Sequence, residues 1–379
     1  MNGKIKVLHI ISDSNFGGAG RLLLTLSECI NKSKFEFLFA VPNKSLLCDM
    51  LQKEGSVFRY SGNGDKSLDI KAIHSIVKIV KKAKPHIVHT HSLFAGRLAA
   101  RLAGIKTHRI VYTKHCVFEI PGMFNWSFCR HVYSFIDNLT AGHVVAVAEV
   151  AKEELINKGV NQNKITVIIN GSLSLRKYTD SEKEYIKKKH NIKNEEFVAG
   201  IVARLEKYKG HDTFLEVAYR LSTEGKKVKF IIVGDGSRRE ELRNYVKNKK
   251  IEDNVIFTGF SDNVSEYMNI FDVNVNCSYG TETSCLAISE GFSIGVPAVV
   301  SDYGGNKNMV INGLTGFVFT QKNSAELYKI IVNLIQAPEV LKNMRENCLD
   351  DYEKRFSAVE MTRQYEDLYE EIVNNISKK

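Results

Sequence analysis

Short apolar runs alternate with longer amphipathic stretches along almost the whole chain. Apolar runs between glycine-rich or polar turns are typical of buried strands, and apolar positions at helical spacing predict the helices between them. In the first half the pattern predicts strands at 6–11, 35–41, 87–90, 109–113, 143–148 and 165–169, and helices at 21–31, 45–53, 68–82, 93–103 and 149–158. In the second half it predicts strands at 197–202, 229–233, 255–258, 273–277, 298–301 and 316–319, and helices at 212–222, 237–249, 263–269, 286–294 and 325–336.

This alternation predicts an α/β protein with two successive Rossmann-like, doubly wound halves. A length of 379 residues fits two domains. The seam is the polar stretch 173–196, which reads as a linker and an exposed helix. The final stretch carries apolar residues at helical spacing from Met361 to Ile372, and periodicity alone leaves open which domain it joins.

Composition narrows the class of protein. The chain is 44% hydrophobic and 25% charged, as expected of a soluble globular protein. No apolar run approaches the roughly 20 residues that a membrane span needs. The N-terminus reads as a first strand and not as a signal peptide. The cysteines lack CxxC spacing, which favours reduced thiols in a cytosol, without a zinc site or disulfides. They are Cys29, Cys48, Cys116, Cys129, Cys277, Cys285 and Cys348.

The net charge of +10 is concentrated in the first half. Residues 1–170 hold 23 Lys and Arg against 12 Asp and Glu, whereas the remainder holds 30 against 31. Such a basic half can meet an anionic membrane surface, a phosphate-bearing substrate or nucleic acid. The alternative is an ordinary solvated surface rich in lysine.

The most informative stretch contains two carboxylates, Glu282 and Glu290. Glu282 lies in a polar loop after an apolar run, and Glu290 lies inside an expected helix. The backbone N–H groups of 284–286 then stand at a helix N-terminus, which favours anions. Two acceptors for hydroxyl groups around a phosphate cradle suggest a nucleotide-sugar pocket. Alternatively, Glu282 is a neighbour of the helix cap and Glu290 a solvated charge.

Further candidates follow predicted strands, at the sheet edge where doubly wound folds bind ligands. Arg204 and Lys209 suit a diphosphate, because Arg makes a planar bidentate contact and Lys a point charge. Gly17 and Gly18 permit close approach of a phosphate, although the turn is not the GxGxxG fingerprint. Each feature in isolation also fits a surface charge or a structural turn.

Three histidines, His89, His91 and His115, end or follow predicted strands. His115 can donate a hydrogen bond to a sugar hydroxyl, or it is structural and bonded to a nearby carbonyl. His89 and His91 share a strand face but have no evident carboxylate as third ligand, so no metal site is expected.

Together these motifs resemble the family-4 retaining glycosyltransferases of the two-Rossmann (GT-B) type, in the branch that builds bacterial polysaccharides and cell-surface glycans. The matching features run in family order over nearly the whole chain. They are Gly17-Gly18-Ala19, His89-Thr90-His91, Thr113-x-His115, Asn170-Gly171, Arg204-Leu205, Lys209-Gly210, Gly234-Asp235-Gly236, Thr258-Gly259-Phe260, Glu282 through Glu290, Gly295-x-Pro297 and Gly304-Gly305.

The resemblance implies domains at 1–172 and 173–357 that face each other across a cleft, with a C-terminal helix at about 358–379 packing back on the first. It implies a catalytic pair, Glu282 on the donor sugar and His115 near the reaction centre, with Glu290 on the ribose. The implied donor-binding residues are Gly17, Gly18, Arg204, Lys209, Gly259, Phe260, Asp262, Ser284, Cys285, Leu286 and Glu290. Of these, the loop 259–262 would border the base.

The implied reaction moves a sugar from a nucleoside diphosphate, with UDP expected, while retaining the anomeric configuration. Two cations and a helix N-terminus would stabilise the leaving phosphates, so no cofactor and no metal are expected. Same-face attack and a covalent route through Glu282 both remain open. The sequence departs from the family pattern at Gly20, Ala148, Thr283, Gly291 and Asn308, and these departures leave the sugar unidentified.

The expected acceptor is a glycan or a polyprenyl-phosphate-linked glycan, and the basic half would receive it. We expect a cytoplasmic protein, peripheral on the anionic inner leaflet of the plasma membrane, that does not bind nucleic acid. The alternatives are a UDP-sugar epimerase of the same architecture and a non-enzymatic basic protein that binds nucleic acid or membranes. A phosphorylase would need a pyridoxal lysine, for which no signature is found.

Overall fold

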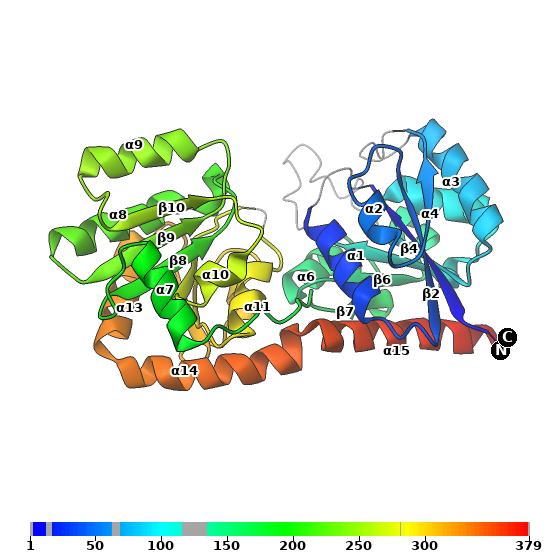
Figure 1. The fold of residues 1–379 in the computed structure, drawn as a ribbon. Helices are drawn as coiled ribbons and strands as arrows, with labels where there is room; N and C mark the ends of the chain where they lie inside the picture. The colour runs from blue at the N-terminus through cyan, green and yellow to red at the C-terminus, as the bar shows by residue number, and fades with distance from the viewer. Residues whose placement is uncertain (1–2, 13–16, 63–68, 116–134, 281, 378–379) are drawn as a thin grey trace. The chain divides into compact units, whose positions relative to one another are not determined.

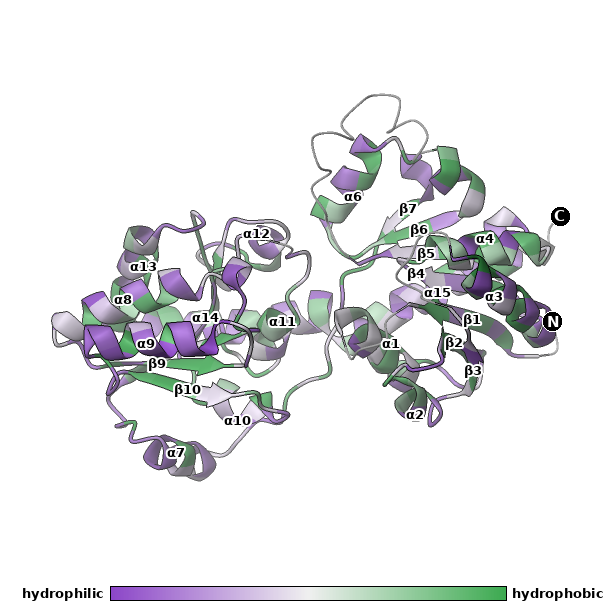
Figure 2. Ribbon diagram, turned by 90° about the horizontal axis from the view of Figure 1, so that it is seen from above, coloured by the Kyte–Doolittle hydropathy of each residue, from purple (hydrophilic) through white to green (hydrophobic). Residues whose placement is uncertain are grey.

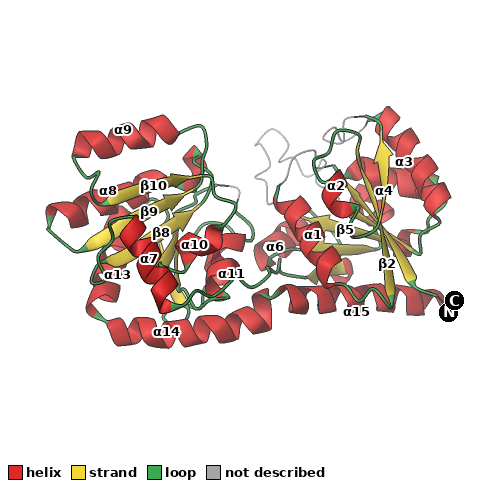
Figure 3. Ribbon diagram, in the orientation of Figure 1, coloured by secondary structure: helices red, strands yellow, loops and turns green. Residues whose placement is uncertain are grey.

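The structure is a computed structural model, and it describes all residues except 1–2, 13–16, 63–68, 116–134, 281 and 378–379. Cys116, Cys129, Thr281 and the residues 13–16 before the glycine turn therefore lie outside the described part. The chain divides into two compact units. The first unit comprises Met1–Gly171 with Ala358–Lys379, and the second comprises Ser172–Ser357 (Figures 1 and 3).

The first unit is built on a parallel sheet of seven strands in the order β3-β2-β1-β4-β5-β6-β7. This is a doubly wound order, in which the chain reverses direction beside β1. The strands are β1 (Ile5–Ile11), β2 (Phe35–Pro42), β3 (Ser56–Tyr60), β4 (Ile87–His91), β5 (Ile110–Lys114), β6 (His143–Ala146) and β7 (Ile165–Val167). Strand β3 was not predicted, because this edge strand is only partly buried and its apolar pattern is weak.

Helices cover both faces of this sheet. They are α1 (Gly18–Cys29), α2 (Cys48–Leu51), α3 (Ile70–Ala83), α4 (Phe94–Leu102), α6 (Glu149–Asn157) and α15 (Ala358–Ser377), with 3-10 turns η1 (Thr107–Arg109) and η3 (Gln162–Lys164). Apolar residues of α1 and α15 share one buried cluster with the sheet, and those of α3 and α4 form another.

Periodicity left the partner of the C-terminal helix open, and packing assigns it to the first unit. Its side chains at 361, 365, 368, 369 and 372 are buried on the sheet face that α1 also covers. Their spacing of three and four residues places them on one side of the helix.

The second unit has a parallel six-stranded sheet in the order β10-β9-β8-β11-β12-β13. The strands are β8 (Phe197–Val202), β9 (Val228–Val233), β10 (Val255–Gly259), β11 (Val273–Asn276), β12 (Ala298–Ser301) and β13 (Gly316–Phe319). The central strands are almost continuously apolar, as sheets covered on both faces require (Figure 2). The prediction of two Rossmann-like sheets is thus confirmed.

The helices of the second unit lie mostly where the sequence predicts them. They are α7 (Asp180–Lys189), α8 (His211–Thr223), α9 (Arg239–Lys249), α10 (Val264–Met268), α11 (Leu286–Phe292), α12 (Asn306–Met309), α13 (Ser324–Gln336) and α14 (Pro338–Asp351), with a 3-10 turn η4 (Lys207–Lys209) and a π turn at Tyr352–Phe356. Thr179 and Glu182 form a capping box that starts α7, the exposed helix expected in the seam. Helix α14 was not predicted as a separate element.

Candidate active site

The polar motifs of the second unit leave the carboxyl ends of neighbouring strands. Arg204 and Lys209 follow β8, Gly259 ends β10, and the loop that leads to Glu282 follows β11. Because all the strands are parallel, these ends lie along one edge of the sheet. In open α/β sheets this edge is where ligands bind.

Lys209 and Glu282 form an ion pair at this edge. Lys209 Nζ lies 2.5 Å from Glu282 Oε2, and the side chains are only 15% and 9% exposed. Ser278 Oγ donates a second hydrogen bond, of 2.9 Å, to the same carboxylate oxygen. The sequence suggested both charged residues but did not predict their pairing, and it did not single out Ser278.

Burial is the largest single influence on the pKa of Lys209 and lowers it, but the charge and the hydrogen bond of Glu282, together with contributions from Cys285 and Tyr208, raise this pKa above its ordinary value. Lys209 is therefore a cation at neutral pH. Burial, reinforced by the charge of Glu282, also raises the pKa of the Cys285 thiol to about 12. Cys285 is thus a neutral thiol and no nucleophile at neutral pH.

Three glycines make room for this pair through close backbone approach. A Cβ on Gly304 would stand 2.1 Å from the carbonyl oxygen of Glu282, and one on Gly305 would stand 1.8 Å from that of Thr283. A Cβ on Gly210, which follows Lys209, would stand 2.1 Å from the Cys277 carbonyl oxygen. The Gly305 N–H also donates to the Glu282 carbonyl, at 3.1 Å. These contacts lock the backbone on both sides of the pair.

Arg204, in the same loop after β8 as Lys209, is exposed and donates a hydrogen bond of 2.7 Å to the Tyr208 hydroxyl. This contact braces the guanidinium, whose remaining donors can serve an anion.

Helix α11 begins at Leu286 with Cys285 as its N-cap, so Glu282 precedes the helix and Glu290 lies one turn into it. Glu290 is partly buried. The Cys285 N–H already contacts Met309 Sδ, at 3.1 Å. The buried Ser284 Oγ has no hydrogen-bond partner among the described residues. A buried hydroxyl without a partner is unusual and is the kind of group that a polar ligand satisfies.

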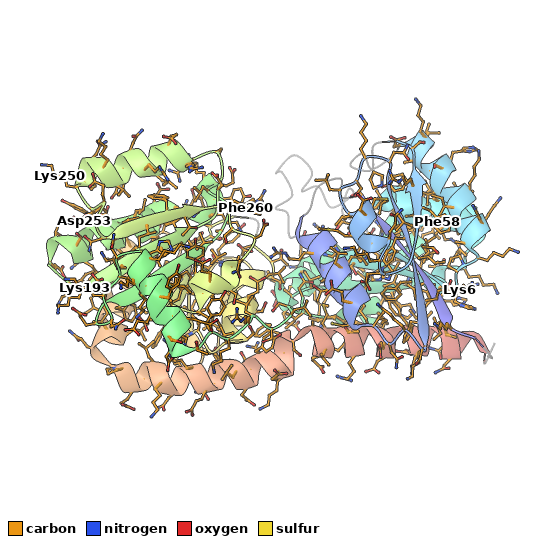
Figure 4. All side chains as sticks on the ribbon, in the orientation of Figure 1. Lys6, Phe58, Lys193, Lys250, Asp253 and Phe260 are labelled. Atoms are coloured by element: carbon orange, nitrogen blue, oxygen red, sulfur yellow. The ribbon has the colours of Figure 1, made fainter. Side chains whose placement is uncertain are left out.

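The loop after β10 contains the other expected donor residues. Gly259 has φ of +76° and its carbonyl accepts from the Gly234 N–H at 2.9 Å, which ties this loop to the end of β9. Phe260 is 73% exposed at the end of β10 (Figure 4), and Asp262 is also exposed. An exposed aromatic side chain at this edge offers a face for stacking.

In the first unit, the glycine turn opens α1 as predicted. Gly17 is the N-cap and accepts from the Arg21 N–H at 3.0 Å. A Cβ on Gly18 would meet no described atom within 4 Å, so the backbone there is open to a ligand.

The predicted histidines meet at the carboxyl ends of β4 and β5, and a fourth, His9 of β1, joins them. His91 lies between His9 and His115, with ring nitrogens 3.1 Å and 3.0 Å apart. The register of β1 and β4, which pairs His9 with His89, brings His9 in. Burial lowers the pKa of all four histidines, and that of His115 falls to about 4.

Nitrogens of His9, His89 and His91 lie within 4.8 Å of one another, close enough to consider a shared metal ion. Both ring nitrogens of His89 already have partners, however, because Nδ1 contacts the Tyr369 hydroxyl and Nε2 the Thr113 hydroxyl, each at 2.6 Å. The cluster is satisfied largely by hydrogen bonds.

The cysteines of the described part are all free thiols. Among the described residues, no helix combines the length and the apolar character needed to cross a bilayer.

Two family profiles match consecutive parts of the chain. Residues 16–172 match Glycosyltransferase Family 4, and residues 182–350 match Glycosyl transferases group 1. The chain is 29% identical to the Escherichia coli UDP-Gal:alpha-D-GlcNAc-diphosphoundecaprenol alpha-1,3-galactosyltransferase, with 99% of each chain covered. It is 27% identical to the alpha-monoglucosyldiacylglycerol synthase of Acholeplasma laidlawii, with 89% of each covered.

Solved structures share the fold. The Anabaena HepE structure in complex with UDP has a TM-score of 0.83 and 21% identity, and the match covers 99% of this chain and 100% of that one. A Rickettsia africae glycosyltransferase also has a TM-score of 0.83 and 21% identity, with 98% and 100% covered. The expected GT-B fold is therefore confirmed.

Proposed function

The chain is a family-4 glycosyltransferase of the GT-B type, and from this premise we propose that it transfers a sugar from UDP to a lipid-linked glycan. The observation that carries the proposal is the Lys209–Glu282 pair, fixed by glycines at the ligand-binding edge of the second unit. The relative that matches 99% of the chain takes its sugar from UDP and uses a diphosphoundecaprenol-linked acceptor.

In this proposal Arg204 and Lys209 neutralise the diphosphate as it leaves. The bond between the anomeric carbon and the β-phosphate oxygen breaks, and the acceptor hydroxyl oxygen bonds to the same face of that carbon. The acceptor proton passes to the departing phosphate. Charge therefore develops on the phosphate, where preorganised cations stabilise the transition state most. Ser284 Oγ, buried without a partner in the described part, supplies a further donor beside the helix start.

Glu282 accepts hydrogen bonds from the transferred sugar, and Glu290 accepts them from the ribose. The two bonds that Glu282 Oε2 already receives, from Lys209 and Ser278, fix the carboxylate and leave Oε1 for substrate hydroxyls. These fixed contacts favour positioning over nucleophilic attack, because a nucleophile needs freedom to approach the anomeric carbon. The Gly259–Asp262 loop, with exposed Phe260, borders the uracil.

The experiment is a transfer assay with purified protein in EDTA, a panel of nucleotide sugars and a polyprenyl-diphosphate-linked glycan. We expect a UDP-sugar to be consumed only when the acceptor is present, with an α-linked product from an α-linked donor. Variants E282Q and R204A should lower the rate about 100-fold or more, whereas the exposed-site control K226A should not. Conversion without an acceptor would indicate an epimerase, and wild-type rates in E282Q would overturn the assigned site.

A further inference from the structure

His91 stands in the middle of a row of three imidazole rings in the first unit. Its Nε2 lies 3.1 Å from His9 Nδ1, and its Nδ1 lies 3.0 Å from His115 Nε2. The ring planes differ by only 20° and 24°, and the centroids are 5.4 Å and 5.2 Å apart. These values place the rings edge to edge, so that each N···N contact is a hydrogen bond in the ring planes.

A neutral imidazole carries one proton, on one nitrogen only. His91 therefore donates to one neighbour and accepts from the other, and both hydrogen bonds must run in the same direction. Burial keeps all three rings neutral at pH 7, because it lowers each pKa. The proton position on His115 is thus coupled to that on His9, two rings away.

The inner end of the row determines the direction. His9 is fully buried, and its Nε2 has no hydrogen-bond partner among the described residues. If the hydrogen bonds were donated inward, from His115 to His91 and from His91 to His9, His9 would carry its proton on this nitrogen. A buried N–H without an acceptor is rare in proteins. If the hydrogen bonds are donated outward, His9 carries the proton on Nδ1 and leaves only a lone pair unsatisfied. The ring at its side, Phe37, offers no lone pair to accept a hydrogen bond.

We infer that the row runs outward, from His9 through His91 to His115, and that it fixes His115 as the Nδ1–H tautomer. His115 Nδ1 then always presents a proton for a substrate hydroxyl or carbonyl oxygen, without a choice of tautomer at the moment of binding. His9 and His91 are positioning residues, and His115 is the group that contacts substrate. Only that last contact rests on the proposed glycosyl transfer, because the direction of the row follows from burial and distances alone.

The first test is nuclear magnetic resonance of the full chain labelled with 15N in its histidine rings, without substrate and in EDTA. Long-range proton–nitrogen correlations distinguish the two tautomers. We expect Nδ1–H on His9, His91 and His115. In H91F the coupling is lost and His115 should populate both tautomers. H91N retains an amide N–H near the former Nδ1 and should restore the Nδ1–H form, whereas exposed H74N should change nothing. An Nε2–H His115 in the wild-type protein would overturn the inference.

Kinetics give a second readout that overall folding does not mimic. H91F should lower the transfer rate about tenfold, the value of one misplaced hydrogen bond, with the UDP dissociation constant unchanged. H91N should recover the rate to within about twofold. A slow H91N whose His115 retains the Nδ1–H form would contradict the positioning role. If no transfer is found in any variant, the proposed function fails while the tautomer result still stands or falls by its own spectrum.

Discussion

Lys209 Nζ and Glu282 Oε2 lie 2.5 Å apart although 73 residues separate them in the chain. The pair joins the loop after β8 to the loop after β11, two strands that are neighbours in the sheet. We therefore propose two roles for each residue. Each holds the other in place, and each faces a different part of the donor.

Breaking the pair from either side should have unequal effects. Lys209→Met leaves a mostly buried carboxylate without its cation and should reduce the free energy of unfolding by about 3 kcal/mol. The double variant K209M/E282Q should recover most of this loss, because neither partner is then charged, yet it should remain inactive. Urea denaturation with a double-mutant cycle measures the coupling. A coupling energy of zero would mean that the pair is not formed in solution.

Gly304 should tolerate no side chain. A Cβ there would stand 2.1 Å from the Glu282 carbonyl oxygen, and φ is +57°. Gly313 has a similar φ of +79° but open space around the Cβ position, which makes it a matched control for backbone strain alone. Gly304→Ala should therefore abolish transfer, whereas Gly313→Ala should cost only the strain of about 1 kcal/mol. Equal effects of the two substitutions in the transfer assay and in urea denaturation would refute the close backbone approach of Gly304 to Glu282.

Acid should destabilise the first unit. The pKa of His115 is about 4 in the folded protein against 6.5 unfolded, and those of His9, His89 and His91 are lowered as well. Between pH 6.5 and 4 the unfolded chain binds more protons, so stability is complete above this window and falls as the pH decreases through it. Each such histidine contributes a slope of about 1.4 kcal/mol per pH unit. Urea midpoints at pH 7.5, 6.0 and 5.0 measure the slope, which should be shallower in H115N and unchanged in H74N.

The first unit should bind anionic membranes. The first unit remains strongly basic when the tail helix is counted with it. Helix α3 and the residue after it expose five lysines, which are Lys71, Lys78, Lys81, Lys82 and Lys84. Ile70, 80% exposed at the start of α3, adds an apolar side chain that can enter the interface. Flotation with anionic liposomes should carry the protein at low salt and release it at high salt. K81E/K82E should bind less, whereas K226E/K247E in the second unit should bind like wild type. Equal flotation of K81E/K82E and K226E/K247E would show that the α3 lysines do not carry the attraction to the membrane.

Much of the fold follows from local pattern. Central strands such as β1, β8 and β9 are mostly apolar runs, interrupted by Lys6 and His9 in β1 and by Lys229 in β9, and runs of this kind can be recognised without tertiary information. The edge strand β3 was missed because its residues are half exposed and their pattern is ambiguous. The partner of α15 could not be read from its own periodicity, which specifies a buried face but not the surface that buries it.

The candidate site was predictable residue by residue but not as a set of contacts. Arg204, Lys209 and Glu282 carry recognisable chemistry after strands, whereas their distances depend on which strands become neighbours. His9 was overlooked for the same reason, because only the β1–β4 register pairs it with His89. That register could have been suspected from the fact that both histidines lie in apolar runs of the first half.

The most direct test of the central claim is calorimetric titration of UDP into the wild-type protein, R204A, K209M and the exposed control K226A. We expect wild type and K226A to bind UDP equally. R204A and K209M should bind UDP at least about tenfold more weakly, because each loses a charge-assisted contact that contributes about 1.5–3 kcal/mol. UDP binding of equal strength in all four folded proteins, or no binding to any of them, would contradict the claim that this edge of the second unit holds the donor.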